Sequence, residues 1–439
     1  MKKGNLLATI EAVSGGWIRR AGPFLKSVKL YVGRDPERVT GPALILFPLL
    51  RATLPCGLAG ILVLRRGGKE EPPPEGDLAA LFAQAAKQDL AALSSGTLAA
   101  GDYLGGPSSL EKLERELLQL KREEPFRRLF FSEPEAGRLK ALSAVMHAFL
   151  AAEEGLLEEK AGCFSTTDLE SVNRGLVLVR DLVWGLDRDI LDNRQRICAL
   201  AGAEKADDVA PEALPKYRKL NFLLNCLDRL EVRGRDSAGI AISFVPADAA
   251  AAGKLLRRIE AEGLQEEWRR RMDAGDLISG SICCSLKGRP GKGDDRGGVS
   301  FTYKTASIIG GLGRNVRELR NQIAQDRLLQ AFARLPVAFE TAFAHTRWAS
   351  VGSITEENCH PLGNFTLPAE AAPAPEEKNY PFYGTGPWSV HVVLNGDIDN
   401  YPLLRDALAA EGERIAPEVT TDTKIIPLQI EKYLRLGHD

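Results

Sequence analysis

A long helical stretch divides the strand-forming parts of this chain, and it limits the fold more than any other feature. The first strand-like run is Leu58–Leu64, and helical periodicity follows over residues 77–223. Short runs rich in β-branched residues return at Ile240–Phe244 and Ser389–Leu394, both typical of buried strands. The sequence therefore combines strands with a helical subdomain at 77–223.

One helix within this subdomain is predicted with particular clarity. Four leucines recur at a spacing that places them on one helix face, and Ser108 with Glu111 predicts a capping box just before them. The leucines are Leu110, Leu113, Leu117 and Leu120. Such a face either packs inside its own subdomain, the more frequent case, or binds a partner helix.

Composition excludes several classes of function. With 57 basic and 59 acidic residues the net charge is -2, so we expect no nucleic-acid partner. Seven cysteines without paired spacing predict neither a disulfide framework nor a metal site, which favours a cytoplasmic location. The apolar run Pro42–Leu50 contains Pro48 and is too short to cross a membrane, and it lies too far from Met1 to be a secretion signal.

Two segments carry side chains suited to attack on an amide and to binding a carboxylate. Cys56 precedes Gly57 at the start of the first strand, where a cysteine is either a nucleophile or a small buried apolar residue. Arg347, in the segment His345–Ser350, is the type of residue that clamps a carboxylate through two hydrogen bonds, although the segment also fits an ordinary strand end.

Three further segments are ambiguous when taken singly. The stretch Arg233–Gly239 leads into a strand and fits a tight turn with solvated charges. Asn395 and Gly396 fit a hairpin turn, yet an Asn side chain and a Gly N–H also suit an oxyanion hole. Asp422 either caps the helix that follows or serves as a ligand carboxylate.

Taken in order, these segments resemble the class II, or N-terminal nucleophile, glutamine amidotransferases. The matching motifs are Arg233-Gly234-Arg235-Asp236-Ser237-Ala238-Gly239, Thr346-Arg347-Trp348-Ala349, Asn395-Gly396-Asp397 and Thr421-Asp422-Thr423. They are most similar to the glutaminase domains of the isomerising glutamine:fructose-6-phosphate aminotransferases (glucosamine-6-phosphate synthases). The resemblance implies an α+β fold, a four-layer αββα N-terminal-nucleophile hydrolase sandwich with a large helical insertion.

The resemblance also implies a reaction that needs no cofactor. Cys56, as the first residue of the mature chain, would attack the side-chain amide of L-glutamine, with its own α-amine as general base. Asn395 and the N–H of Gly396 would stabilise the oxyanion, and Arg233 would lie near the thiol. The products would be glutamate and ammonia.

The substrate-binding residues follow from the same resemblance. Arg347 with Ser350 would hold the α-carboxylate of glutamine, while Asp422 and the backbone of Gly396 would hold its α-ammonium group. Trp348 would lie on a loop that closes over the substrate. Ammonia would pass to a sugar-phosphate acceptor bound by a further domain that is missing here, and a homodimer is expected.

Departures from the family pattern qualify these expectations. Leu394, Val351 and Lys424 replace His, His and Glu of the family, which predicts altered affinity for glutamine. We expect residues 1–55 to be a leader, either a propeptide or an over-long gene start, because an acylated Cys56 could not act as base. The remaining boundaries are a first strand and linker at 56–76, the insertion at 77–223, and a C-terminally incomplete glutaminase domain at 224–439.

The sequence also fits two alternative functions. The chain could be the glutaminase half of another class II amidotransferase with a different acceptor. It could also be a catalytically silent relative, in which the leader and the helical insertion serve regulation or docking.

Overall fold

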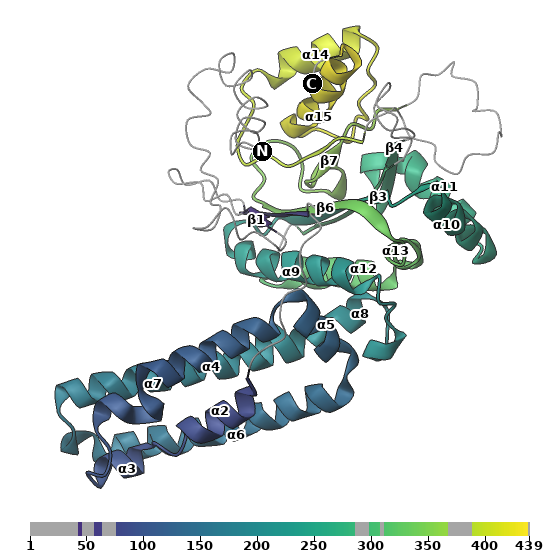
Figure 1. The fold of residues 1–439 in the computed structure, drawn as a ribbon. Coiled ribbons are helices and arrows are strands. Elements are labelled where there is room, and N and C mark those ends of the chain that lie inside the picture. The colour runs from purple at the N-terminus through teal and green to yellow at the C-terminus, as the bar shows by residue number, and fades with distance from the viewer. Residues whose placement is uncertain are drawn as a thin grey trace, which may run out of the picture. The chain divides into compact units, whose positions relative to one another are not determined.

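The computed structural model describes residues 43–45, 57–63, 76–285, 298–307, 311–367 and 389–437. The chain forms two compact units, which we call the helical unit, Gly67–Pro215, and the sheet unit, Met1–Arg66 with Lys216–Asp439 (Figure 1). The insertion was expected at 77–223, and the last residues of that range, from Lys216 on, belong to the sheet unit.

The helical unit is a bundle of helices around an apolar core. Its elements are α2 (Leu78–Ala85), α3 (Leu90–Ser94), η2 (Ala100–Gly105), α4 (Gly106–Leu120), α5 (Glu123–Phe131), α6 (Glu133–Lys160), η3 (Ala161–Cys163), α7 (Thr166–Trp184), the π-helical η4 (Gly185–Asp192), α8 (Asn193–Leu200) and η5 (Ala206–Asp208). Ser165 and Asp168 form a capping box that begins α7. One buried carboxylate, Glu153, accepts hydrogen bonds from the hydroxyl of Tyr103 and the N–H of Leu90 inside the bundle.

The predicted leucine face is confirmed within this unit. Leu113 and Leu117 are buried, and Leu110 and Leu120 pack against the same apolar cluster. The capping box predicted at Ser108 is wrong, because α4 begins two residues earlier, after Gly105, and makes no side-chain cap hydrogen bond. Pro107 in the first turn explains the early start, since its fixed φ suits that position and it has no N–H to satisfy.

The sheet unit contains all the strands that the structure describes. Its elements are β1 (Ala43–Ile45), β2 (Gly57–Val63), α9 (Leu214–Leu230), η6 (Glu231–Arg233), β3 (Ser237–Pro246), α10 (Ala249–Ala261), α11 (Gln265–Ala274), η7 (Gly275–Leu277), β4 (Ser281–Ser285), β5 (Gly298–Ala306), α12 (Arg314–Gln325), α13 (Arg327–Ala333), β6 (Val337–Arg347), η8 (Glu356–Asn358), β7 (Leu362–Gly363), β8 (His391–Val392), α14 (Tyr401–Ala410), η9 (Asp422–Lys424) and α15 (Ile425–Arg435).

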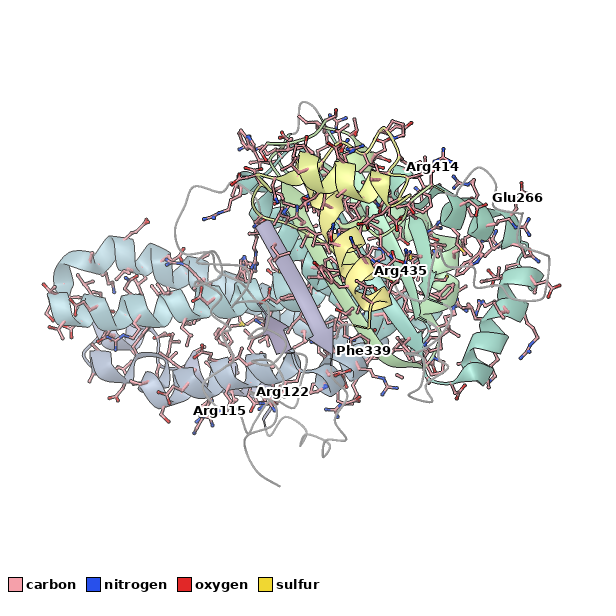
Figure 2. The ribbon with its side chains drawn as sticks, turned by 90° about the horizontal axis from the view of Figure 1, so that it is seen from above. Arg115, Arg122, Glu266, Phe339, Arg414 and Arg435 are labelled. Atoms are coloured by element: carbon pink, nitrogen blue, oxygen red, sulfur yellow. The ribbon has the colours of Figure 1, made fainter. Side chains whose placement is uncertain are left out.

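Six of these strands form one antiparallel sheet in the order β1-β2-β6-β3-β5-β4, and β7 pairs with β8 in a second, two-stranded sheet. Helices α9, α12 and α13 lie on one side of the large sheet, and β7, α14 and α15 lie on the other (Figure 1). Figure 2, seen from above, shows α14 and α15 lying over the strands of the large sheet. Mixed helices and antiparallel sheet agree with the expected α+β class.

Burial explains which strands the sequence predicted. Strand β3 is covered on both faces, so its residues read as a continuous apolar run. The run Ser389–Leu394 was expected to be a buried strand, but only His391 and Val392 pair, and both are half-buried. The strand is shorter than predicted because β7, the strand that pairs with it, is only two residues long.

Register brings distant segments to one end of the large sheet. Gly57 at the start of β2 pairs with Thr346 near the end of β6. Ser237 at the start of β3 pairs with Arg347, the last residue of β6. Strand β1, which pairs with β2, comes from the segment 1–55 that was expected to be a leader.

Candidate functional site

The start of β2 is attached to the end of β6 by a buried hydrogen bond. The N–H of Gly57 donates to Thr346 Oγ1 at 3.0 Å, and the Thr346 hydroxyl lies 3.4 Å from the carbonyl oxygen of Leu230. Cys56, the predicted nucleophile, lies outside the described residues. Gly57, which follows Cys56 in the chain, is the described residue nearest to it in sequence.

The segment before β3 docks onto the segment after β6. Asp236 Oδ2 accepts the N–H of Ala349 at 2.8 Å, and the N–H of Asp236 donates to the carbonyl of Arg347 at 3.2 Å. A side chain at Gly234 would meet the backbone of Arg347, so the two segments approach as closely as backbones allow. Two of the motifs quoted above are thus joined by specific contacts.

Arg347 is buried at the end of β6, where its guanidinium organises the loop that follows. Only 4% of Arg347 is exposed. Its Nη1 donates to the carbonyl of Ser353 at 3.2 Å, and its Nη2 donates to the carbonyl of Val351. A guanidinium carries five donors in a fixed fork, which allows it to hold a loop and bind a carboxylate together.

Asn395 and Gly396 lie in a turn that contacts the end of β6. Asn395 Oδ1 lies 2.6 Å from His345 Nε2, and Gly396 has a φ of +149°, which favours glycine. Asp397, the next residue, accepts a hydrogen bond from the hydroxyl of Ser350 at 2.5 Å. The turn is therefore attached to the segment His345–Ser350 by two side-chain contacts.

Asp422 is attached to the same turn. It is 3% exposed, and its Oδ2 accepts the N–H of Ile398 at 2.7 Å. The sequence left open whether Asp422 caps the following helix, and the structure gives neither η9 nor α15 a side-chain cap hydrogen bond. The carboxylate instead fixes the loop three residues beyond Asn395.

Asn358, which the sequence analysis missed, positions the segment that carries Asp422. This side chain is fully buried, and its Oδ1 accepts the N–H groups of Thr420 and Thr421 at 2.7 and 2.9 Å. Its Nδ2 donates to the carbonyl of Glu418 at 3.0 Å. Asn358 lies on the short helix η8, and no local pattern in the sequence signals this role.

Lys424, one of the departures from the family pattern, belongs to a buried charged network. Lys424 Nζ lies 2.6 Å from Asp276 Oδ2, and Lys304 Nζ lies 3.7 Å from Asp276 Oδ1. The N–H of Gly363 also donates to Asp276. Burial alone would raise the pKa of Asp276, but the two lysines outweigh it and hold that pKa below its ordinary value.

Two predicted site residues are exposed. Arg233 lies on η6, and its side chain is exposed and makes no hydrogen bond or ion pair with the residues that the structure describes. Trp348 is 53% exposed between Arg347 and Ala349. The described contacts therefore join Arg347, Asn395 and Asp422 by short links, whereas Arg233 is not brought among them.

Neither a metal site nor a membrane-spanning helix is found in the described part of the chain, and the cavity in the sheet unit is small. A cavity of about 30 Å³ beside Asp276, Cys283 and His391 has the size of a single water molecule. Within the described ranges, no group of His, Cys, Asp and Glu side chains is arranged to hold a metal ion. None of the helices described has the length and apolar character needed to span a bilayer.

Comparison with known proteins relates part of the chain to one group of enzymes. A stretch of 122 residues, 27% of this chain, is 34% identical to glutamine--fructose-6-phosphate aminotransferase [isomerizing] of Rhizobium meliloti and covers 16% of its length. The aminotransferase of the same name from Aeropyrum pernix is 27% identical over 164 residues, 37% of this chain and 22% of that protein. That from Methanothermobacter thermautotrophicus is 34% identical over 96 residues, 22% of this chain and 12% of that protein.

These similarities are partial on both sides. The matched stretch spans less than a quarter of the length of each of these relatives. No protein-family model matches the chain. No solved structure matches it. About a quarter of this chain is therefore related in sequence to the glutamine–fructose-6-phosphate aminotransferases, which are enzymes.

Proposed function

We propose that the sheet unit is a class II glutaminase that hydrolyses L-glutamine to glutamate and ammonia. The observation that carries this proposal is the convergence of Arg347, Asn395 and Asp422 at one end of the large sheet. Hydrogen bonds link the segments that carry these residues, through the pairs His345–Asn395, Ser350–Asp397 and Asp422–Ile398. The succession of helices, large sheet, small sheet and helices also supports a four-layer αββα arrangement.

Each polar group in this arrangement suits one part of glutamine. The Arg347 guanidinium binds the α-carboxylate, toward which the Ser350 hydroxyl turns from Asp397 when glutamine is bound. The Asp422 carboxylate binds the α-ammonium group. Asn395 Nδ2 and the N–H of Gly396 would then donate hydrogen bonds to the side-chain carbonyl oxygen of glutamine. Trp348 remains available at the surface to cover a bound substrate.

The chemistry requires a free amino terminus at Cys56. Its α-amine removes the thiol proton, and the thiolate attacks the amide carbon to form a tetrahedral oxyanion. The same proton is returned to the leaving nitrogen, which departs as ammonia and leaves a thioester. Water then hydrolyses the thioester to glutamate and restores the thiol.

The proposal for the molecule that accepts the ammonia rests on the names of the relatives alone. Glutamine and fructose 6-phosphate are the substrates in the names of these proteins. We extend this to the present chain as a proposal: its ammonia is delivered to fructose 6-phosphate to form glucosamine 6-phosphate, with a separate domain binding the sugar phosphate.

Strand β1 favours a second candidate function. Residues 43–45 pair with β2, so the segment expected as a leader contributes a strand to the folded sheet. If that segment stays covalently attached, the nitrogen of Cys56 remains an amide and cannot act as a base. The chain would then be a silent relative that serves binding or regulation rather than hydrolysis.

One experiment separates the two functions. The purified full chain is examined by intact mass and by its release of glutamate from glutamine, alongside Asn395→Ala and the surface control Lys432→Met. The glutaminase proposal predicts a species that begins at Cys56, with activity lowered about 100- to 1,000-fold by Asn395→Ala. A uniform mass that includes Met1, with no glutamate formed, would support the silent relative.

A further inference from the structure

We propose that His345 is a positioning residue that sets the orientation of the Asn395 carboxamide for catalysis. This inference rests on the proposed glutaminase function, and it adds a role that the family resemblance did not assign. It depends on two buried histidines, His345 and His360, which hold two consecutive residues of the Asn-Gly turn.

The contact between His345 and Asn395 selects one tautomer of the imidazole and one orientation of the carboxamide. His345 is 1% exposed, and its Nε2 lies 2.6 Å from Asn395 Oδ1. An amide oxygen only accepts hydrogen bonds, so Nε2 must carry the proton and donate it. Because Oδ1 is turned toward His345, the Nδ2 amide group is directed to the opposite side of the planar carboxamide. An oxyanion hole requires that Nδ2, and not Oδ1, faces the substrate.

His360 holds the preceding residue in place. The two imidazole rings lie with centroids 4.7 Å apart, and His360 is 4% exposed. The N–H of Leu394 donates to His360 Nδ1 at 3.4 Å. Gly239 on β3 allows this packing, because a side chain there would collide with the backbone carbonyl of His360. The turn is thus anchored immediately before Asn395 as well as through its side chain.

The surroundings keep His345 neutral. Burial, together with the nearby Arg347 guanidinium, lowers the pKa of His345 to about 4, although the hydrogen bond to Asn395 opposes this shift. Among the described residues, His345 Nδ1 has no hydrogen-bond partner, so the ring makes one directed donation, to Asn395. A neutral ring in a single tautomer gives the carboxamide one fixed orientation.

Steady-state kinetics of two variants distinguish a positioning role of His345 from a role in packing alone. His345→Phe keeps a buried ring but removes the donor, whereas His345→Gln places an amide N–H close to the former Nε2. We expect His345→Phe to lower kcat about 10- to 100-fold with KM within about twofold, and His345→Gln to restore most of kcat. His391→Gln, which changes a half-buried histidine of β8 that makes no such contact to Asn395, serves as the control.

A double variant tests the coupling directly. If His345 acts through Asn395, the His345→Phe, Asn395→Ala double variant has the same kcat as Asn395→Ala alone. Additive losses, or an unchanged kcat in His345→Phe, would overturn the inference while the glutaminase function stands. A wild-type preparation that releases no glutamate would overturn the function and the inference together.

Nitrogen NMR supplies a readout that does not depend on turnover. The chain has five histidines, so single substitutions assign each imidazole in a protein labelled with ¹⁵N-histidine. We expect His345 to be neutral with its proton on Nε2 between pH 6 and 8. A proton on Nδ1, or a charged ring at pH 6, would contradict the proposed orientation.

Discussion

Lys424 Nζ lies 2.6 Å from Asp276 Oδ2, and both side chains are almost completely buried. The pair joins η7 to the residues that directly follow Asp422, so it stabilises the backbone that carries a predicted substrate-binding carboxylate. Burial lowers the pKa of Lys424, against the attraction of Asp276. Removing one partner would leave an uncompensated charge in the interior.

We therefore predict that Lys424→Met destabilises the sheet unit. The free energy of unfolding should fall by about 3 kcal/mol, because the buried Asp276 carboxylate would lose its nearer cation and keep the more distant Lys304. Urea denaturation measures this. The matched control is Lys432→Met, which removes the partly exposed pair with Glu411 and should change stability by less than about 1 kcal/mol. Equal effects of the two substitutions would contradict the assignment of a buried pair.

Acid should destabilise the protein through three histidines whose pKa values the fold lowers. Burial lowers the pKa of His345 and of His391 to about 4, and it lowers the pKa of His360 well below the ordinary value. Between about pH 6.5 and pH 4 the unfolded chain therefore binds protons that the folded chain does not, so stability falls as the pH falls through this window. Each of His345 and His391 can contribute at most roughly 3 kcal/mol.

Comparison with one variant isolates this effect. The urea midpoint of the wild type should drop on going from pH 7 to pH 4.5, and that of His345→Gln should drop less. The lowered pKa of Asp276 acts only at more acid pH, since its contribution is lost below the ordinary range of a carboxyl group. If the two proteins respond identically to acid, His345 does not titrate as described.

Local patterns predicted part of the fold. Strand β3 was recognised from its continuous apolar run, and α4 from its leucines, because in both cases burial acts on neighbouring residues of one element. Strand β5 and most of β6 were not predicted. The residues of β6 include several alanines, and its stability as a strand comes from pairing with β2 and β3, which are distant in sequence.

The candidate site was also predicted only in part. The order of the motifs along the sequence identified Arg347, Asn395 and Asp422, and the structure links the segments that carry them by short contacts. It did not identify Asn358 or assign a role to His345, because both act through hydrogen bonds that the tertiary fold creates. Arg233 was expected near the thiol of Cys56, which lies outside the described residues, so its place beside the thiol stays a prediction.

Asn358→Ala should weaken glutamine binding from a distance. Loss of its carboxamide leaves the N–H groups of Thr420 and Thr421 without their buried acceptor and loosens the segment before Asp422. We expect stability to fall by about 2 kcal/mol and KM for glutamine to rise several-fold. Urea denaturation and initial-rate kinetics give both values. A destabilised variant with unchanged KM would show that Asn358 does not position Asp422.

Arg347→Lys should impair recognition of the substrate carboxylate. A lysine keeps the charge but lacks the planar fork, so KM for glutamine should rise about tenfold or more. The control is Arg320→Lys on α12, where the arginine binds Asn221 and Asn225 away from the turn. Equal KM values for the wild type and Arg347→Lys would exclude Arg347 as the carboxylate ligand.

Covalent labelling with a diazoketone analogue of glutamine shows whether Cys56 is the nucleophile of a glutaminase. Such an analogue binds as glutamine does and alkylates the attacking thiolate, so peptide mass spectrometry then locates the modified residue. The glutaminase account predicts one adduct, on Cys56 with a free α-amine, which excess glutamine prevents and Arg347→Lys weakens. A protein that remains unmodified, or that is modified on another cysteine without protection by glutamine, would contradict it.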